Sequence, residues 1–324
     1  MSGSAPLNMD SRLPRRRVVF AWDMHYSCNY RCPYCFYTTT GWTKLAENSN
    51  YKTPKEWREV WERIRQKYGR CQLRITAGEP FTYPGFPDVV AAVSELHDIQ
   101  VTSNCSQTEA FREFVKKADP RRVELDCTFH PLQGEFEAFI ENVLLLRRAG
   151  FVANVCYLAY PPQMGPMAEF KKRFEARGVY MNMAIFWGSH QGGRYPHAYT
   201  PEEKAQIKSV IGCEVSAETV GLDPIPINGK VCGAGQRYAV VQGDGRVYRC
   251  GQLCHKDQSL GSIFDPDFEL FKDGRPCVVD YCRCKEYQSA WEEEEIEALN
   301  RRGKVIVKES SGNRSTRAWG GNTP

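Results

Sequence analysis

The sequence predicts an α/β fold in which a partial (β/α)6 barrel precedes a small, cysteine-rich C-terminal β-hairpin/α domain. Two observations predict it. Short apolar segments alternate with helix-length amphipathic segments from residue 18 onward, and a second group of cysteines follows where that alternation ends. Strands that alternate with helices imply parallel βαβ units. The alternation stops near residue 190, so six repeats fit, whereas a full eight-stranded barrel needs about 250 residues.

The expected strands are short, rich in β-branched or aromatic residues, and bounded by turn residues. They are the segments 18–24, 71–77, 99–104, 122–129, 152–159 and 180–188. Helices are expected between them and after the last, over 54–68, 85–97, 108–118, 135–149, 164–177 and 200–211.

Local signals mark the ends of these helices. A Ser or Thr followed three residues later by Glu predicts a capping box at a helix start, and this pairing occurs at Thr53 and Glu56, Ser106 and Glu109, and Thr200 and Glu203. Glycines that follow the last helical turn are typical stop signals, here Gly69, Gly150 and Gly178.

The predicted strands alternate polar and apolar side chains. On the fourth strand Glu124, Asp126, Thr128 and His130 share one face, opposite an apolar face that includes Cys127. A parallel sheet buried on both faces reads as nearly continuous apolar residues instead. The pattern therefore indicates a barrel that encloses a polar ligand cavity, internal salt bridging between Arg74 and Glu124 or Asp126 being the alternative.

Composition limits the class of protein. The 324 residues carry a net charge of +4 and contain 14 cysteines. No apolar run approaches the ~20 residues that span a bilayer, and residues 1–14 lack the apolar core of a signal peptide. We therefore expect a cytoplasmic protein that binds neither membrane nor nucleic acid. In a reducing cytosol, so many cysteines indicate metal ligation rather than disulfides.

We expect four segments along the chain: a lead-in over residues 1–17, the barrel over 18–212, the cysteine-rich domain over 213–295, and a polar, disordered tail over 296–324. Four cysteines on or beside barrel strands are interpreted as small core residues: Cys71, Cys105, Cys127 and Cys156.

Three cysteines follow the first strand directly, at positions 28, 32 and 35. Cys28, Cys32 and Cys35 can wrap one four-iron cluster from a single loop, and three local ligands leave one iron open to a substrate or cofactor. The end of the first strand is also where barrel active sites form. A zinc site with His25 as its fourth ligand is the alternative.

This Cys-x3-Cys-x2-Cys motif resembles the signature of the radical S-adenosylmethionine (SAM) superfamily, whose usual fold is a TIM-like partial barrel. The resemblance covers roughly residues 18–190. It implies that the three cysteines hold a [4Fe–4S] cluster whose open iron binds SAM. Reductive cleavage of SAM then yields a 5′-deoxyadenosyl radical, which takes a hydrogen atom from the substrate. An electron donor such as a flavodoxin or ferredoxin is implied as a partner.

Other positions match family elements. Gly78, Glu79 and Pro80 follow the second strand and resemble the motif that receives the SAM amino group, and Tyr34 resembles the aromatic residue that lies against the adenine. The resemblance implies that Asn104 and Thr128, at the ends of the third and fourth strands, reach the SAM carboxylate or ribose.

Six further cysteines lie between residues 232 and 284. Asp244 and Gly245, between two apolar runs, predict a hairpin with Cys232 and Cys250 at its feet. So many cysteines in one short stretch of a reduced protein indicate a metal cluster, a zinc ribbon being the alternative.

The spacing from Cys232 through Gly245 to Cys250 resembles the opening of the SPASM and Twitch extensions of radical SAM enzymes. The dense seven-cysteine run of SPASM is absent from the sequence, so the shorter Twitch form with one auxiliary [4Fe–4S] cluster fits better. The resemblance implies Cys232, Cys250, Cys282 and Cys284 as its ligands, with Cys277 or Cys254 as rivals.

These features favour a radical SAM oxidoreductase that oxidises a small polar metabolite, such as a sugar or cyclitol, with the auxiliary cluster as electron acceptor. Asp126, His130 and Glu124 are the candidate bases on the polar face. The alternative is crosslinking, epimerisation or oxidation of a peptide. The sequence does not indicate the oligomeric state.

Overall fold

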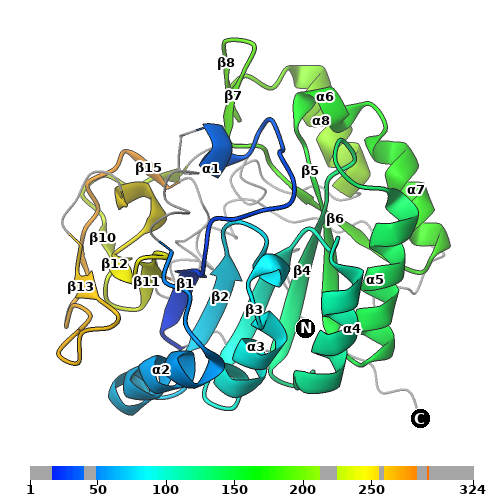
Figure 1. Ribbon diagram of the computed structural model, residues 1–324. Coiled ribbons are helices and arrows are strands. Elements are labelled where there is room, and N and C mark those ends of the chain that lie inside the picture. Colours follow the sequence, from blue (N-terminus) through cyan, green and yellow to red (C-terminus); the bar gives the residue numbers. More distant parts are fainter. Residues whose placement is uncertain (1–16, 40–48, 212–224, 255–258, 283–289, 292–324) are drawn as a thin grey trace, which may run out of the picture.

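The computed structural model describes residues 17–39, 49–211, 225–254, 259–282 and 290–291. Its centre is a run of six parallel strands (Figure 1), which confirms the predicted partial barrel. The strands are β1 (Val19–Asp23), β2 (Gln72–Thr76), β3 (Asp98–Ser103), β4 (Val123–Phe129), β5 (Val152–Leu158) and β6 (Met181–Ala184). The expected tail, Cys213 and Cys284 lie outside the described residues.

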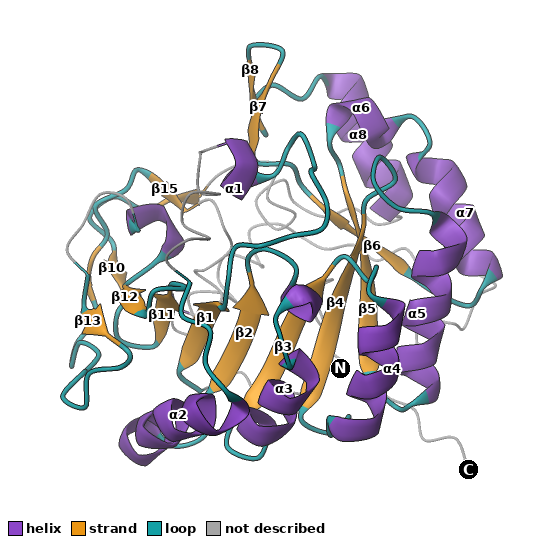
Figure 2. Ribbon diagram, in the orientation of Figure 1, coloured by secondary structure: helices purple, strands orange, loops and turns teal. Residues whose placement is uncertain are grey.

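Helices cover the outer face of this sheet (Figure 2), as βαβ connections require. The long ones are α2 (Pro54–Tyr68), α3 (Phe86–Ser94), α4 (Thr108–Lys117), α5 (Phe136–Arg148), α7 (Met167–Ala176) and α8 (Pro201–Ile211). Short turns of helix, α1 (Phe36–Thr39) and α6 (Pro161–Met164), follow β1 and β5.

Two of the three predicted capping boxes form. Thr53 and Glu56 exchange hydrogen bonds at the start of α2, and Thr200 and Glu203 do so at the start of α8. The box predicted at Ser106 is wrong: α4 has Gln107 at its N-cap and no side-chain cap. Ser106 instead bonds to Asn104, so the hydroxyl serves the strand-end loop rather than the helix.

The C-terminal segment continues the barrel sheet. The predicted hairpin forms from β11 (Tyr238–Val241) and β12 (Arg246–Tyr248), and β11 pairs in parallel with β1. A further strand, β13 (Gly261–Ser262), extends the edge, so the sheet order is β13-β12-β11-β1-β2-β3-β4-β5-β6. This addition brings the C-terminal cysteines beside the first strand, at the left of Figure 1.

A second hairpin, absent from the sequence prediction, follows the last barrel strand. The segment expected as one strand over 180–188 divides into β6 and β7 (Gly188–His190), and β7 pairs antiparallel with β8 (Gly193–Tyr195). This hairpin rises above the ends of the strands in Figure 1.

The two faces of the barrel sheet differ as predicted. On the outer face Leu125, Cys127 and Phe129 of β4 are at most 1% exposed and belong to the main core. On the inner face Asp126 and Thr128 are half-buried, and Thr102 of β3 is exposed. At the level of these residues the polar side of the sheet is partly accessible to solvent, whereas Glu124 at a deeper level is 2% exposed.

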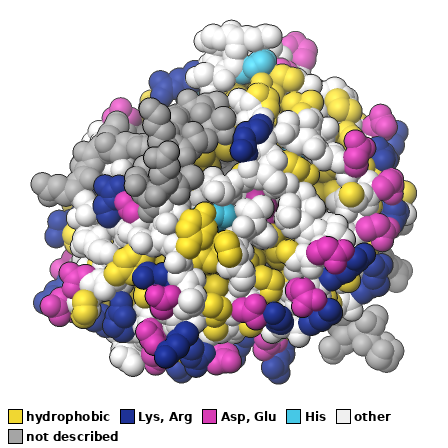
Figure 3. Space-filling model, in the orientation of Figure 1, with side chains coloured by type: hydrophobic (Ala, Val, Ile, Leu, Met, Phe, Trp, Pro, Cys, Tyr) yellow, Lys and Arg dark blue, Asp and Glu magenta, His cyan; other side chains and the backbone are white. Residues whose placement is uncertain are grey.

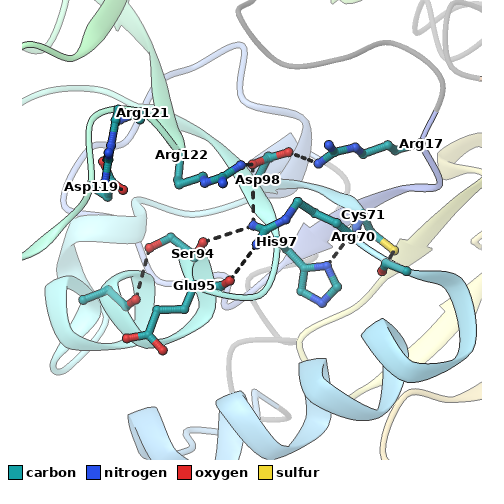
Figure 4. Close-up of polar contacts among 12 residues, drawn as sticks. Arg17, Arg70, Cys71, Ser94, Glu95, His97, Asp98, Asp119, Arg121 and Arg122 are labelled. Atoms are coloured by element: carbon teal, nitrogen blue, oxygen red, sulfur yellow. Dashed lines mark hydrogen bonds and ion pairs between the residues drawn. The ribbon is translucent and has the colours of Figure 1, made fainter.

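A buried carboxylate ties together the opposite, N-terminal ends of the strands (Figure 4). Asp98, whose side chain is 2% exposed, pairs with Arg17, with Arg122 at 3.2 Å and with Arg70 at 3.8 Å. Beside it the buried His97 accepts from the Cys71 N–H at 3.0 Å. These contacts join the starts of four neighbouring strands, β1 to β4, at the end away from the cysteine loop.

The surface carries both signs of charge. Lys and Arg side chains lie interspersed with Asp and Glu on the face that Figure 3 shows. Among the described residues, no helix has the length and apolar character needed to cross a bilayer.

Candidate active site and cysteine cavity

The cysteine loop leaves β1 at the carboxyl edge of the sheet and ends at α1. Cys32 is buried, whereas Cys28 and Cys35 are half-buried. The Cys35 N–H donates to the Cys32 carbonyl at 3.0 Å, which closes a turn. Burial raises the pKa of the Cys32 thiol to about 11 and also raises that of Cys28. Metal binding would overcome this because it favours the thiolate.

Gly78 lies directly beneath the cysteine loop. Its φ is +41°, and a Cβ there would stand 2.2 Å from the backbone oxygen of Ser27. The Glu79 N–H donates to that same oxygen at 2.8 Å. The motif after β2 therefore supports the loop from below, and only a residue without a side chain allows this approach.

The Glu79 carboxylate is turned into the protein. One oxygen accepts from the Phe81 N–H at 3.1 Å and from the Ser103 hydroxyl at 2.8 Å, and the other accepts from the Asn104 N–H at 2.7 Å. Burial raises its pKa to about 7. In this arrangement the Glu79 carboxylate holds the end of β3. Pro80 is buried and opens the 3-10 turn Pro80–Thr82.

Asn104 joins the end of β3 to the cysteine loop. Its side-chain Nδ2 donates to Asn29 Oδ1 at 3.1 Å and lies 3.9 Å from Cys28 Sγ, while its Oδ1 accepts from the Ser106 hydroxyl. The Tyr30 N–H also donates to Cys28 Sγ, at 3.4 Å. Asn29 and Ser106 were not predicted as site residues, because isolated polar residues in loops carry no periodic signal.

Aromatic rings pack around Tyr34, the residue before the last cysteine of the loop. The Tyr34 hydroxyl lies 2.7 Å from His130 Nδ1, and their rings stack. Tyr160, after β5, contacts the Tyr34 ring with centroids 4.6 Å apart, and its hydroxyl lies 3.0 Å from His190 Nδ1 on the β7–β8 hairpin. Burial lowers the pKa of His130 to about 4, so it is neutral at pH 7.

The candidate bases occupy different levels of the inner face. Asp126 accepts from Gln100 Nε2 at 2.7 Å and from Asn154 Nδ2 at 3.1 Å, so amides hold both oxygens. Burial raises its pKa, against the opposing effect of these amides and Arg74. Glu124 is 2% exposed and lies one level deeper. Thr128 is half-buried above Asp126, opposite Cys156 of β5.

A cavity in the C-terminal segment is surrounded by four cysteines. Its lining residues are Ile227, Cys232, Ala234, Arg249, Cys250, Gln252, Leu253, Cys277, Val279, Cys282 and Ala290. Three of the four ligands expected from the resemblance thus reach one cavity, and the fourth, Cys284, lies outside the described residues.

Short strand pairs bring these cysteines together. Cys232 ends β10 (Val231–Cys232), which pairs with β14 (Arg275–Pro276) immediately before Cys277. Cys282 ends β15 (Tyr281–Cys282), which pairs with β9 (Ile225–Pro226). Cys254 packs instead between the cavity residues and the apolar group of Tyr26, Tyr37 and Ala77. The structure therefore brings the rival residue Cys277, rather than Cys254, to the cavity wall.

Both sites suit iron–sulfur clusters by donor chemistry. Cysteine sulfurs are the donors that such clusters use, and hydrogen bonds to the sulfurs adjust them. The first loop supplies three thiols with N–H donors beside Cys28. The second site places four thiols around a shared cavity. Within the described part of the chain, no three Cys, His, Asp or Glu side chains meet closely enough to hold a single metal ion.

This chain resembles one family model and several solved structures. A model described as the radical SAM superfamily matches residues 23–162. The anSMEcpe structure with bound AdoMet (SAM) has a TM-score of 0.55 and 16% identity, covering 86% of this chain and 82% of that one.

Two further structures match at similar levels. AnSMEcpe with bound AdoMet and the Cp18Cys peptide has a TM-score of 0.53 and 13% identity, covering 86% of this chain and 81% of that one. Streptococcus suis SuiB bound to S-adenosylmethionine has a TM-score of 0.54 and 12% identity, covering 78% of this chain and 62% of that one. At these identities the likeness concerns the fold.

Proposed function

We propose that this chain is a radical SAM oxidoreductase, because a model of that superfamily matches residues 23–162. In this proposal the enzyme takes a hydrogen atom from a small polar substrate and uses an auxiliary cluster as electron acceptor. The observation that carries this proposal is the presence of two cysteine sites in neighbouring parts of the fold. One follows β1, and the other lies beside the hairpin that the pairing of β11 with β1 joins to the barrel sheet. When bound, the first cluster supplies the electron that cleaves SAM to methionine and a 5′-deoxyadenosyl radical, and the second accepts the electron left by substrate oxidation.

The chain's own residues would hold SAM at the carboxyl edge of the barrel. Gly78 keeps the turn under the cysteine loop, Asn104 contacts that loop from β3, and Tyr34 offers an aromatic face. Polar groups that line the inner face below this level, chiefly Asp126 and Asn154, favour a hydrophilic substrate. Cys232, Cys250, Cys277 and Cys282 are the proposed ligands of the auxiliary cluster.

A peptide substrate is the second candidate. It is favoured by the likeness to anSMEcpe, whose structure contains the Cp18Cys peptide and whose TM-score is 0.53. The exposed Thr102 and the half-buried strand ends are compatible with either class of substrate. The electron donor is proposed to be a flavodoxin or ferredoxin, since cleavage of SAM requires a one-electron reductant.

Anaerobic reconstitution tests the proposal. We expect about eight irons per chain, held as two four-iron clusters, and formation of 5′-deoxyadenosine with dithionite as reductant. Cys32→Ala should abolish 5′-deoxyadenosine, whereas the control Cys71→Ala, in the core beside β2, should retain it. Zinc in place of iron, or no 5′-deoxyadenosine from the reconstituted protein, would overturn the proposal.

The substrate class is tested by stimulation of the same reaction. Cyclitols and amino sugars are compared with short Cys- or Ser-containing peptides as additives. A rise in 5′-deoxyadenosine above the substrate-free rate with the first group alone supports a metabolite substrate, whereas a rise with peptides alone selects the second candidate.

A further inference from the structure

One charged side chain lines the cavity of the four cysteines among the described residues. Arg249 immediately precedes Cys250 and shares the cavity wall with it. Its two terminal nitrogens donate to backbone carbonyls of β14, to Pro276 at 3.3 Å and to Arg275 at 3.1 Å. The guanidinium therefore joins the segment before Cys250 to the segment before Cys277.

The third nitrogen of this guanidinium, Nε, makes no hydrogen bond within the part of the chain that the structure describes. This nitrogen is buried. A buried donor that makes no hydrogen bond carries a free-energy cost. This cost, at the wall of a cavity whose other liners are cysteines and uncharged residues, points to an acceptor that occupies the cavity.

An iron–sulfur cluster supplies such an acceptor. Four thiolates and a [4Fe–4S] core carry net negative charge, which increases on reduction, and hydrogen bonds to the sulfurs raise the reduction potential. An arginine side chain stays positively charged in proteins and presents its donors in a fixed plane. Arg249 thus has the charge and the free donor that favour the reduced state.

We infer that Arg249 is a positioning residue of the auxiliary cluster: its Nε–H donates to a sulfur of the cluster, and its charge raises the reduction potential of that cluster. The inference rests on the proposed function, since it needs the auxiliary cluster. With Arg249 beside it, the cluster would accept an electron more readily than the same cluster in a cavity without a positive charge.

The test isolates the auxiliary cluster in a variant of the full chain that carries Cys28→Ala, Cys32→Ala and Cys35→Ala. After reconstitution, iron is counted, and the midpoint potential is measured by following the reduced-cluster EPR signal at poised potentials. Arg249→Gln is then added to this background. We expect about four irons per chain in both proteins and a more negative midpoint potential in the Arg249→Gln protein.

Two further variants distinguish an effect on the midpoint potential of the cluster from an effect on cluster binding. Arg246→Gln removes the same charge three residues earlier, at the start of β12. This side chain is 51% exposed and paired with Asp244, so the midpoint potential of the cluster should be unchanged. Arg249→Lys keeps the charge but cannot reproduce the planar set of donors. It should retain iron and show a smaller negative shift than Arg249→Gln.

The outcomes are distinguishable. No iron in the parent triple variant overturns the auxiliary cluster and this inference together. Full iron with an unchanged potential in Arg249→Gln overturns the inference alone. Loss of iron from both Arg249 variants, with iron retained in Arg246→Gln, would show that Arg249 only holds the two cysteine segments together. That result also overturns the inferred effect on the reduction potential.

Discussion

Cys277 and Cys254 show how little a single residue's identity says about its role. Both are cysteines of the C-terminal segment, but only Cys277 lines the four-thiol cavity, because β14 ends immediately before it. Cys254 follows the 3-10 turn Gly251–Leu253, and its thiol donates to the Cys250 carbonyl at 3.5 Å. Spacing in the sequence ranked them as rivals, and strand pairing separates them.

Iron content distinguishes the two residues. Cys277→Ala should lower the iron of the reconstituted protein from about eight toward about four per chain, because a four-iron cluster needs its thiolate ligands. Cys254→Ala should leave the iron unchanged. An unaltered iron content in Cys277→Ala would exclude it as a ligand and favour Cys284.

At the scale of elements, the turn after β2 illustrates packing between two loops that are distant in sequence. Gly78 and Gly85 both have positive φ, +41° and +70°. Only Gly78 lies against another backbone, since a Cβ on Gly85 would meet nothing within 4 Å. Both glycines adopt a backbone conformation that is strained for other residues, but only at Gly78 would an added Cβ also clash with neighbouring backbone.

Substitution by alanine should therefore separate them. Gly85→Ala should cost about 1 kcal/mol of stability from the left-handed backbone and keep SAM binding. Gly78→Ala must displace the cysteine loop and should weaken SAM binding at least about tenfold, equivalent to about 1.4 kcal/mol. Equilibrium dialysis with labelled SAM measures this, and equal affinities in the two variants would contradict the predicted support of the loop.

For the whole molecule, stability depends on the polar cluster at the N-terminal ends of the strands. Asp98 is almost fully buried while its three arginine partners are 22–43% exposed. Removing the charge leaves these guanidinium groups without their carboxylate, at a cost that partial exposure reduces. Asp98→Asn should lower the free energy of unfolding by about 2 kcal/mol. Urea denaturation measures it, and an unchanged midpoint would show that the pairs contribute nothing.

The pH dependence of stability follows from His97 in the same cluster. Burial lowers the pKa of His97 from 6.5 to about 4 in the folded chain, and its Nε2 lies 2.9 Å from the Trp61 carbonyl. Between pH 6.5 and 4 the unfolded chain therefore binds a proton that the folded chain does not, so stability falls as pH decreases.

Between pH 6.5 and 4 the free energy of unfolding should fall by about 3 kcal/mol, because each unit of difference in the His97 pKa corresponds to about 1.4 kcal/mol. His97→Ala should lower stability at pH 7. It should also reduce the slope of the unfolding free energy against pH, by an amount that corresponds to the uptake of up to one proton on unfolding. His130, whose pKa is also about 4, contributes a similar slope that this variant retains. An identical slope in the His97 variant would contradict the assignment.

Three features could be predicted from the amino-acid sequence alone: the order of the barrel strands and their helices, the two faces of β4, and the loop of Cys28, Cys32 and Cys35. These follow from local rules of periodicity, capping and short spacing, which operate within a few residues. Features that depend on contacts between distant segments are visible only in the folded chain. In the fold, β11 extends the sheet at β1, and Glu79 turns toward Ser103 and Asn104. Arg249 lines the same cavity as Cys277. The physical reason is that pairing register and the direction of a buried side chain are set by the partners available across the fold, and no local pattern encodes those partners.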